Sequence, residues 1–193
     1  MRMKHLPYLL VKDLVKTGDC LFFVGSSLLA QGILQFSEFS HVALIIRYDD
    51  LMPHYKDRCV QTVEALDKGI EPYFFTDRVK AETLVGTEVY WLPVNLSENQ
   101  RLLCREYVLA EIPLHRQYGY GTLVSNAFGY QPIAYKESRI CSEWVAAVYV
   151  ACCFVDWQIA PRPGDIQNWL GKRAEDLVKI IGPKPNEALD NIC

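Results

Sequence analysis

The sequence predicts an α+β fold in which an antiparallel sheet packs against helices. Short runs rich in apolar and β-branched residues, which are typical of strands, fill the first half of the chain. The longest apolar helical pattern comes only in the second half, and strands followed by helices indicate this fold class. The chain has 193 residues, 50% of them hydrophobic, which is the size and apolar content of one domain. We therefore expect a single domain over residues 1–193, with its core at about 17–170.

Four strands are expected from runs that are apolar, β-branched or alternating and that are bounded by turn residues. Pro93 stops the last of them, because proline has no N–H to donate to a sheet. The mixed segment 25–39 suits a short helix that ends before Ser40. The expected strands cover residues 20–24, 41–48, 59–65 and 87–92.

Two longer helices are expected after the strands. Ser97 precedes apolar residues at helical spacing, and this helix ends before Pro113. Ser138 is the expected cap of a second helix at about 139–154. That helix is apolar nearly all round, so we expect it to be buried.

The remaining segments are less regular. The Gly- and Tyr-rich segment 118–130 gives no firm prediction. Residues 161–165 are expected to form a surface turn. The tail from residue 169 is expected to form a short helix or strand and then a loose end.

Charge and hydropathy exclude some classes of function. The net charge is −3 and no run is rich in Lys or Arg, so we expect no nucleic-acid partner. Pro7, Lys12 and Asp13 interrupt the apolar residues near the start, so no secretory signal is expected. No uncharged apolar stretch has the length of a membrane span. A cytoplasmic location is expected, with delivery as an effector or a phage product left open.

The seven cysteines predict neither disulfides nor a metal site. An odd number of cysteines without a secretory signal indicates a reducing compartment. The spacings lack paired C-x-x-C motifs with nearby histidines, so no metal and no cofactor are expected. Cys152 and Cys153 fall deep in the predicted buried helix and are expected to be core residues.

Cys141 has the most favourable position for reactivity. It falls in the first turn of the predicted helix, where free backbone N–H groups and the helix dipole stabilise a thiolate. The same N–H groups can stabilise an oxyanion. The alternative is a small core residue, since a free cysteine is usually buried. Glu143 is expected to be a charge that caps this helix start.

His41 and Glu64 are the expected partners of Cys141. His41 begins a predicted strand, where its side chain can reach a cleft and act as a general base. If this strand pairs antiparallel with the predicted strand 59–65 so that His41 lies opposite Glu64, the Glu64 carboxylate can accept a hydrogen bond from a ring N–H of His41. The alternatives are a histidine that only makes a hydrogen bond at a strand edge and an exposed carboxylate at a strand end.

Three short motifs in a fixed order carry a resemblance to a known family. Their order is histidine, then glutamate, then cysteine, whereas ordinary papain-like enzymes place the cysteine first. This pattern resembles the circularly permuted papain-like NlpC superfamily, in particular its YiiX-like branch, although Ala43 stands where glycine is common. The motifs are TGDCLFF at 17–23, FSHVALI at 39–45 with VEA at 63–65, and CSEWVA at 141–146 with PGDI at 163–166.

The resemblance implies a permuted papain-like fold with the nucleophile at a helix N-terminus. It implies that Cys141 is the nucleophile, His41 the base and Glu64 the orienting residue. Asp19 is expected to be structural. An aromatic hydroxyl often lies near the cysteine in this family. The candidate contacts to substrate or oxyanion are Tyr118, Tyr120, Tyr135 and Ser142.

The expected function is that of a cysteine hydrolase that cleaves an amide bond through a thioester. The substrate would be a peptide, such as a peptidoglycan fragment, or an N-acyl amide. Two alternatives stay open: a lipid-directed acyltransferase or esterase, and a binding module that keeps the fold without the chemistry. An apolar groove beside Cys141 would favour the first alternative, and an unreactive thiol would favour the second.

Overall fold

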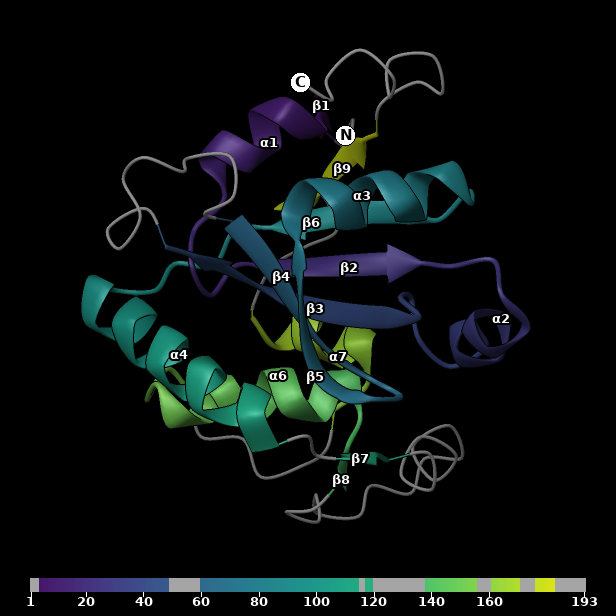
Figure 1. The fold of residues 1–193 in the computed structure, drawn as a ribbon. Helices are drawn as coiled ribbons and strands as arrows, with labels where there is room; N and C mark the ends of the chain where they lie inside the picture. The colour runs from purple at the N-terminus through teal and green to yellow at the C-terminus, as the bar shows by residue number, and fades with distance from the viewer. Residues whose placement is uncertain are drawn as a thin grey trace.

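The protein forms a seven-stranded sheet with helices on both faces (Figure 1). The strand order is β1-β9-β6-β2-β3-β4-β5, and a two-stranded ladder joins β7 to β8. Among the described helices, none is long and apolar enough to cross a membrane. The computed structural model describes residues 4–48, 60–114, 117–119, 138–155, 161–170 and 176–182.

The sheet is antiparallel except at one edge, where β1 and β9 run parallel. The expectation of an antiparallel sheet is therefore wrong for this edge, which is built from the two ends of the described chain. The seven strands of the whole sheet are β1 (Lys4–Pro7), β2 (Cys20–Val24), β3 (His41–Arg47), β4 (Val60–Leu66), β5 (Gly69–Phe74), β6 (Glu88–Leu92) and β9 (Val178–Ile181). The small ladder consists of β7 (Gln117–Tyr118) and β8 (Ser138–Arg139).

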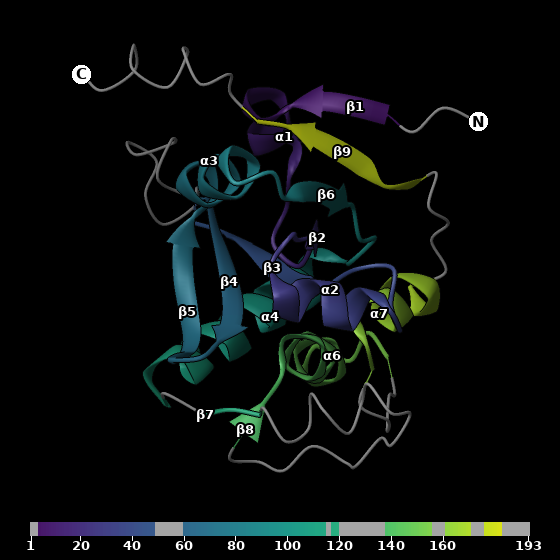
Figure 2. The ribbon, with the colours of Figure 1, turned by 90° about the vertical axis from the view of Figure 1, so that its right-hand side faces the viewer.

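Two cores lie on opposite faces of the sheet, with α1 and α3 on one face and α4, α6 and α7 on the other (Figure 2). Because strand side chains alternate, Leu21 and Ile45 pack toward α1 and α3. Phe22 and Leu44 pack toward α6, where Trp144 is fully buried. The helices are α1 (Tyr8–Leu14), α2 (Leu28–Leu34), α3 (Phe75–Leu84), α4 (Glu98–Glu111), α6 (Cys141–Ala151) and α7 (Pro163–Trp169), with a 3-10 turn at Ile112–Leu114.

The four strands expected in the first half are present, as are the helices expected at 25–39 and after Ser97. The strand expected to begin at residue 59 is described from Val60. In the tail, the prediction of a short helix or strand is confirmed by β9, and residues 183–193 lie outside the described ones. The elements β1, α1, β5 and α3 were not expected from the sequence.

Two local predictions are wrong. Ser138 does not cap α6, because it lies in β8 and the helix begins only at Cys141. Instead, the Glu143 carboxylate accepts a hydrogen bond of 3.1 Å from the N–H of Ile140, as expected for a capping charge. Residues 161–165 are not a surface turn, because α7 begins at Pro163 and both Pro163 and Gly164 are buried.

Asp19 joins the start of β2 to the segment after β6. Its buried carboxylate accepts hydrogen bonds from the N–H of Lys16 (2.9 Å), from Trp91 Nε1 (3.0 Å) and from the N–H of Val94 (3.0 Å). Arg101 adds an ion pair at 3.5 Å. This set of partners fits the expectation that Asp19 is structural.

Asp19→Asn should lower the free energy of unfolding by about 2 kcal/mol or more, because an amide replaces an acceptor for several buried donors. Urea denaturation measures this loss. The exposed Asp77→Asn on α3 is the matched control and should change stability little. Equal stability of the two variants would contradict the structural role of Asp19.

Candidate active site

Cys141 is the first residue of α6, at the end of the helix that lies beside the start of β3. The backbone N–H groups of Val42 and Ser142 lie near its sulfur and lower the pKa of the thiol. Val42 precedes the ladder between β3 and β4, which begins at Leu44, so its N–H is available to the thiol. Further N–H groups of the first helical turn lack acceptors within the helix. The thiol therefore lies at a cluster of backbone donors that favours a negative charge.

His41, the first residue of β3, lies between Cys141 and Glu64. Its Nε2 is 2.9 Å from Oε2 of Glu64. Nδ1 is left free of Glu64, and Cys141 lies close enough for its charge to raise the pKa of His41. The ring packs against Phe23 at 5.4 Å between centroids, which restrains its orientation. The structure thus brings together the three side chains that the sequence pattern singled out.

The register between β3 and β4 differs from the predicted one by two residues. The ladder pairs Ile45 with Thr62, whereas the prediction placed Ile45 opposite Val60. A shift of two residues keeps every side chain on the same face of the sheet, because side chains alternate with period two. His41 and Glu64 therefore meet diagonally across the strands instead of directly opposite each other.

Glu64 is fully buried and its carboxylate is saturated with donors. Oε1 accepts from Thr62 Oγ1 at 3.1 Å and from Arg78 Nε at 2.7 Å. Oε2 accepts from Arg78 Nη2 at 2.8 Å in addition to its contact with His41. Such a bidentate pair fixes both the position and the charge of the carboxylate.

Arg78 is the residue of this cluster that the sequence analysis missed. It comes from α3 and stacks beside the rings of Phe23 (5.3 Å) and Tyr73 (5.6 Å), and it also pairs with Glu82. The spacing of Arg78 and Glu82 is that of a helical ion pair, which is visible in the sequence. Nothing in the sequence, however, places this helix beside Glu64.

The pKa values of Cys141 and His41 move in opposite directions. Burial lowers the pKa of His41, but the charges and hydrogen bonds of Cys141 and Glu64 outweigh burial and raise it to about 10. Burial raises the pKa of Cys141, but the charge and hydrogen bond of His41 and the two backbone donors outweigh burial and lower it. The two shifts together favour a thiolate beside an imidazolium over a neutral thiol beside a neutral imidazole.

The pKa of Glu64 is also shifted. Burial raises it, while the hydrogen bonds and charges of His41 and Arg78 outweigh burial and lower it to about 2. Glu64 therefore stays ionised at neutral pH and holds the imidazolium by its charge as well as by its position.

Other described cysteines have the opposite electrostatics. Burial raises the pKa of the Cys20 thiol to about 12, although a contact of 2.9 Å with Tyr149 Oη opposes it. Burial also raises the pKa of Cys104 and of Cys152. Cys20, Cys104 and Cys152 are expected to be unreactive core residues, in contrast to Cys141. The expectation that Cys153 is also a core residue is wrong, because α6 ends at Ala151 and Cys153 is exposed.

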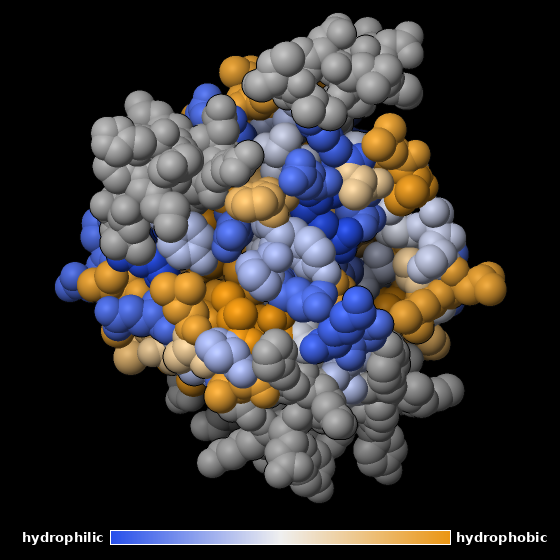
Figure 3. Space-filling model, viewed as in Figure 1, coloured by the Kyte–Doolittle hydropathy of each residue, from blue (hydrophilic) through white to orange (hydrophobic). Residues whose placement is uncertain are grey.

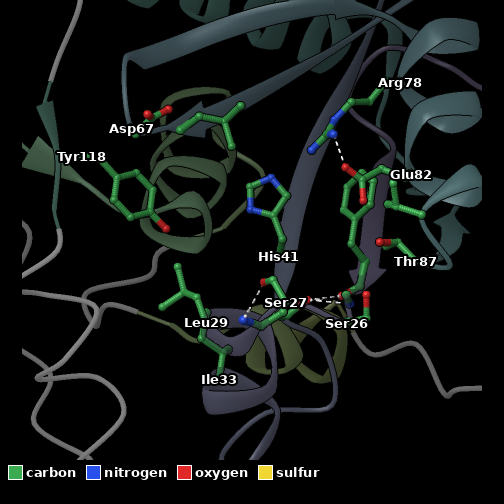
Figure 4. A pocket seen from close by; sticks show the side chains of 16 residues that line it. Ser26, Ser27, Leu29, Ile33, His41, Asp67, Arg78, Glu82, Thr87 and Tyr118 are labelled. Carbon is green, nitrogen blue, oxygen red and sulfur yellow. Dashed lines mark hydrogen bonds and ion pairs between the residues drawn. The ribbon is translucent and has the colours of Figure 1, made fainter.

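A cavity of about 570 Å³ opens beside His41 (Figure 4). His41 and Tyr118 line it, whereas Cys141, with 3% of its surface exposed, does not. Of the other tyrosine candidates, Tyr120 and Tyr135 lie outside the described residues. The Ser142 hydroxyl is buried and donates to the Pro161 carbonyl, so only its backbone N–H faces the sulfur.

The comparisons with known proteins show the fold. No protein-family model matches the sequence, and no curated protein matches it. Among solved structures, the crystal structure of the metalloprotein YiiX from Escherichia coli O157:H7 is similar, with a TM-score of 0.54 and 15% identity. The similarity covers 91% of this chain and 92% of that chain. In the described part of this chain, no three His, Cys, Asp or Glu side chains gather as metal ligands. The chain has a mixed α and β, YiiX-like fold.

Proposed function

We propose that this protein is a cysteine hydrolase of the permuted papain-like type, which cleaves an amide bond through a thioester on Cys141. One observation carries the proposal. A thiol at a helix N-terminus lies beside a histidine that lowers its pKa, and a buried carboxylate holds that histidine at 2.9 Å. This is the arrangement that nucleophilic catalysis by cysteine requires.

The reaction begins with attack of the Cys141 thiolate on the carbonyl carbon of the substrate. The backbone N–H groups around the start of α6 stabilise the negative charge that forms on the carbonyl oxygen. The imidazolium of His41 then gives its proton to the leaving nitrogen, the C–N bond breaks, and a thioester remains on Cys141. Neutral His41 next takes a proton from water, which attacks the thioester and releases the acid.

Glu64 and Arg78 are positioning residues in this scheme. Glu64 Oε2 fixes one ring nitrogen of His41, so the other nitrogen faces the sulfur and the leaving group. Arg78 holds both oxygens of Glu64 and so keeps the carboxylate from turning away. The imidazole therefore keeps one orientation during both proton transfers.

The proposed substrate contains an amide bond, either in a peptide or in an N-acyl amine. A cell-wall peptide remains the expectation that the family resemblance suggests. The next experiment separates an enzyme from a binding module that keeps the fold without the chemistry.

A burst assay with p-nitrophenyl acetate tests the proposal, because this ester acylates activated cysteines without a matched substrate. We expect a burst of p-nitrophenol that approaches one equivalent per chain, and the burst should be lost in Cys141→Ala. Cys153→Ala removes an exposed thiol and is the control that should keep the burst. A protein with no burst, or with a burst that survives in Cys141→Ala, would not be the proposed enzyme.

A further inference from the structure

The cavity beside His41 lies on one side of the proposed reacting bond. Among the described side chains, His41 contributes to its lining and Cys141 does not. In amide cleavage, the general acid must reach the leaving nitrogen, while the sulfur keeps the acyl carbon. The space that adjoins the imidazole therefore receives the amine half of the substrate, and the acyl half stays at the sulfur.

One wall of this cavity is aliphatic. Leu29, Ala30 and Ile33 of α2 form it, and Val85, at the end of α3, is a further aliphatic residue of the lining. Leu29 is 56% exposed and Val85 is 66% exposed, so neither is covered by the described chain. Figure 3 shows apolar side chains gathered at the edge of the molecule where α2 lies. Burial of these side chains against an aliphatic group would favour binding.

The charged groups of the cavity are unfavourable for an anion. Arg78 lines it, but its guanidinium already pairs with Glu64 and with Glu82. The carboxylates of Asp67 and Glu82 also line the cavity. Apart from His41, the described lining thus offers no cation that is left for a carboxylate of the substrate, and Asp67 and Glu82 would repel one.

We propose that this cavity selects an aliphatic amine as leaving group and rejects one that carries a carboxylate. Amides of alkyl amines, or bonds before an internal aliphatic residue, would be cleaved in preference to a bond before a free C-terminal amino acid. The inference rests on the proposed function, because it assigns the two sides of the bond from the roles of Cys141 and His41.

The inference is tested by the partition of the acyl-enzyme between water and an added amine, an experiment that does not require the natural acyl group to be known. The enzyme is acetylated with p-nitrophenyl acetate, and an amine is added as an alternative to water. The amine nitrogen attacks the thioester, the C–S bond breaks, His41 takes the proton from the nitrogen, and an acetamide is released. Because this step is the reverse of amide cleavage, the attacking amine occupies the site of the leaving group. Mass spectrometry measures the acetamide formed.

The amines are compared at equal concentrations of free base. We expect isopentylamine to capture the acetyl group with saturation, and at least about tenfold better than leucine, which adds a carboxylate to the same aliphatic body. Ethylamine, with a shorter chain, should be about fivefold weaker or more, because it buries fewer methylene groups.

Variants of the cavity lining test which side chains cause the preference among amines. Leu29→Ser should weaken capture by isopentylamine about fivefold, and Leu28→Ser, at a position 93% exposed on the same helix and outside the lining, should not. Asp67→Asn should improve capture by leucine severalfold, with the exposed Asp77→Asn as charge control. A normal burst with equal use of leucine, ethylamine and isopentylamine would overturn this inference alone. Absence of the burst would overturn the proposed function and the inference with it.

Discussion

His41→Ala should slow alkylation of Cys141 at about pH 6 by roughly two orders of magnitude. In the wild-type protein, the charge and hydrogen bond of His41 help to outweigh burial and lower the pKa of the thiol. Without His41, burial is opposed only by the backbone donors, so the pKa should rise and the thiolate fraction in acid should fall. The rate of reaction with iodoacetamide, followed by mass mapping of Cys141 across a pH series, measures the change.

The alkylation experiment has a matched control, and the pH dependence of the reaction itself gives a second test. His5→Ala removes an exposed histidine on β1 and should leave the profile of Cys141 unchanged. In the wild-type protein, cleavage of an amide, whose leaving nitrogen needs the proton of the imidazolium, should decline as the pH rises through about 10, where His41 loses that proton. Identical alkylation profiles for the wild-type protein and His41→Ala would contradict the coupling between the two residues.

Glu64→Gln should lower the free energy of unfolding at neutral pH by about 3 kcal/mol, because the folded protein holds the pKa of Glu64 far below its ordinary value. The pKa of Glu64 is lowered from its ordinary value of 4.5 to about 2. Its stabilising contribution is therefore fully present above about pH 4.5 and is lost as the pH falls through about 2. Denaturant unfolding at a series of pH values measures this contribution.

The difference in stability between the wild-type protein and Glu64→Gln should therefore shrink as the pH falls. Glu64→Gln should also lower the pKa of His41, because that carboxylate helps to raise it, so the alkaline decline of amide cleavage should move to lower pH. Glu106→Gln, at an exposed position of α4, is the control and should show neither effect. A loss of stability that stays constant down to strong acid would show that the charge of Glu64 is not responsible.

Much of the site was predictable because its residues lie at the ends of elements with strong local signals. The β-branched run after His41 and the apolar run after Cys141 mark a strand and a buried helix, and both residues stand at the first position. Glu64 could be placed on the correct face because a strand has a period of two. Its register was off by two residues, because strand pairing also depends on the connection between the strands.

The parts that the sequence could not predict depend on tertiary contacts. Arg78 meets Glu64 only because α3 packs against β4, β5 and β6, and no local pattern reports that packing. The first turn of α7 contains Pro163 and Gly164, residues that are typical of loops. Gly164 packs closely against residues 37 and 38. Its N–H donates to Ser37 Oγ at 3.0 Å, and a side chain at this position would crowd Ser37 and Glu38. The parallel edge of β1 with β9 joins segments from the two ends of the described chain and has no local signal.

The position of the acyl group after reaction tests the central claim most directly. The protein is mixed with p-nitrophenyl acetate, quenched in acid during the burst, digested and mapped by mass spectrometry. We predict one acetyl group per chain, on Cys141, and none on Cys153, which is exposed. An acetyl group on any other residue, or release of p-nitrophenol without acetylation of Cys141, would contradict the account.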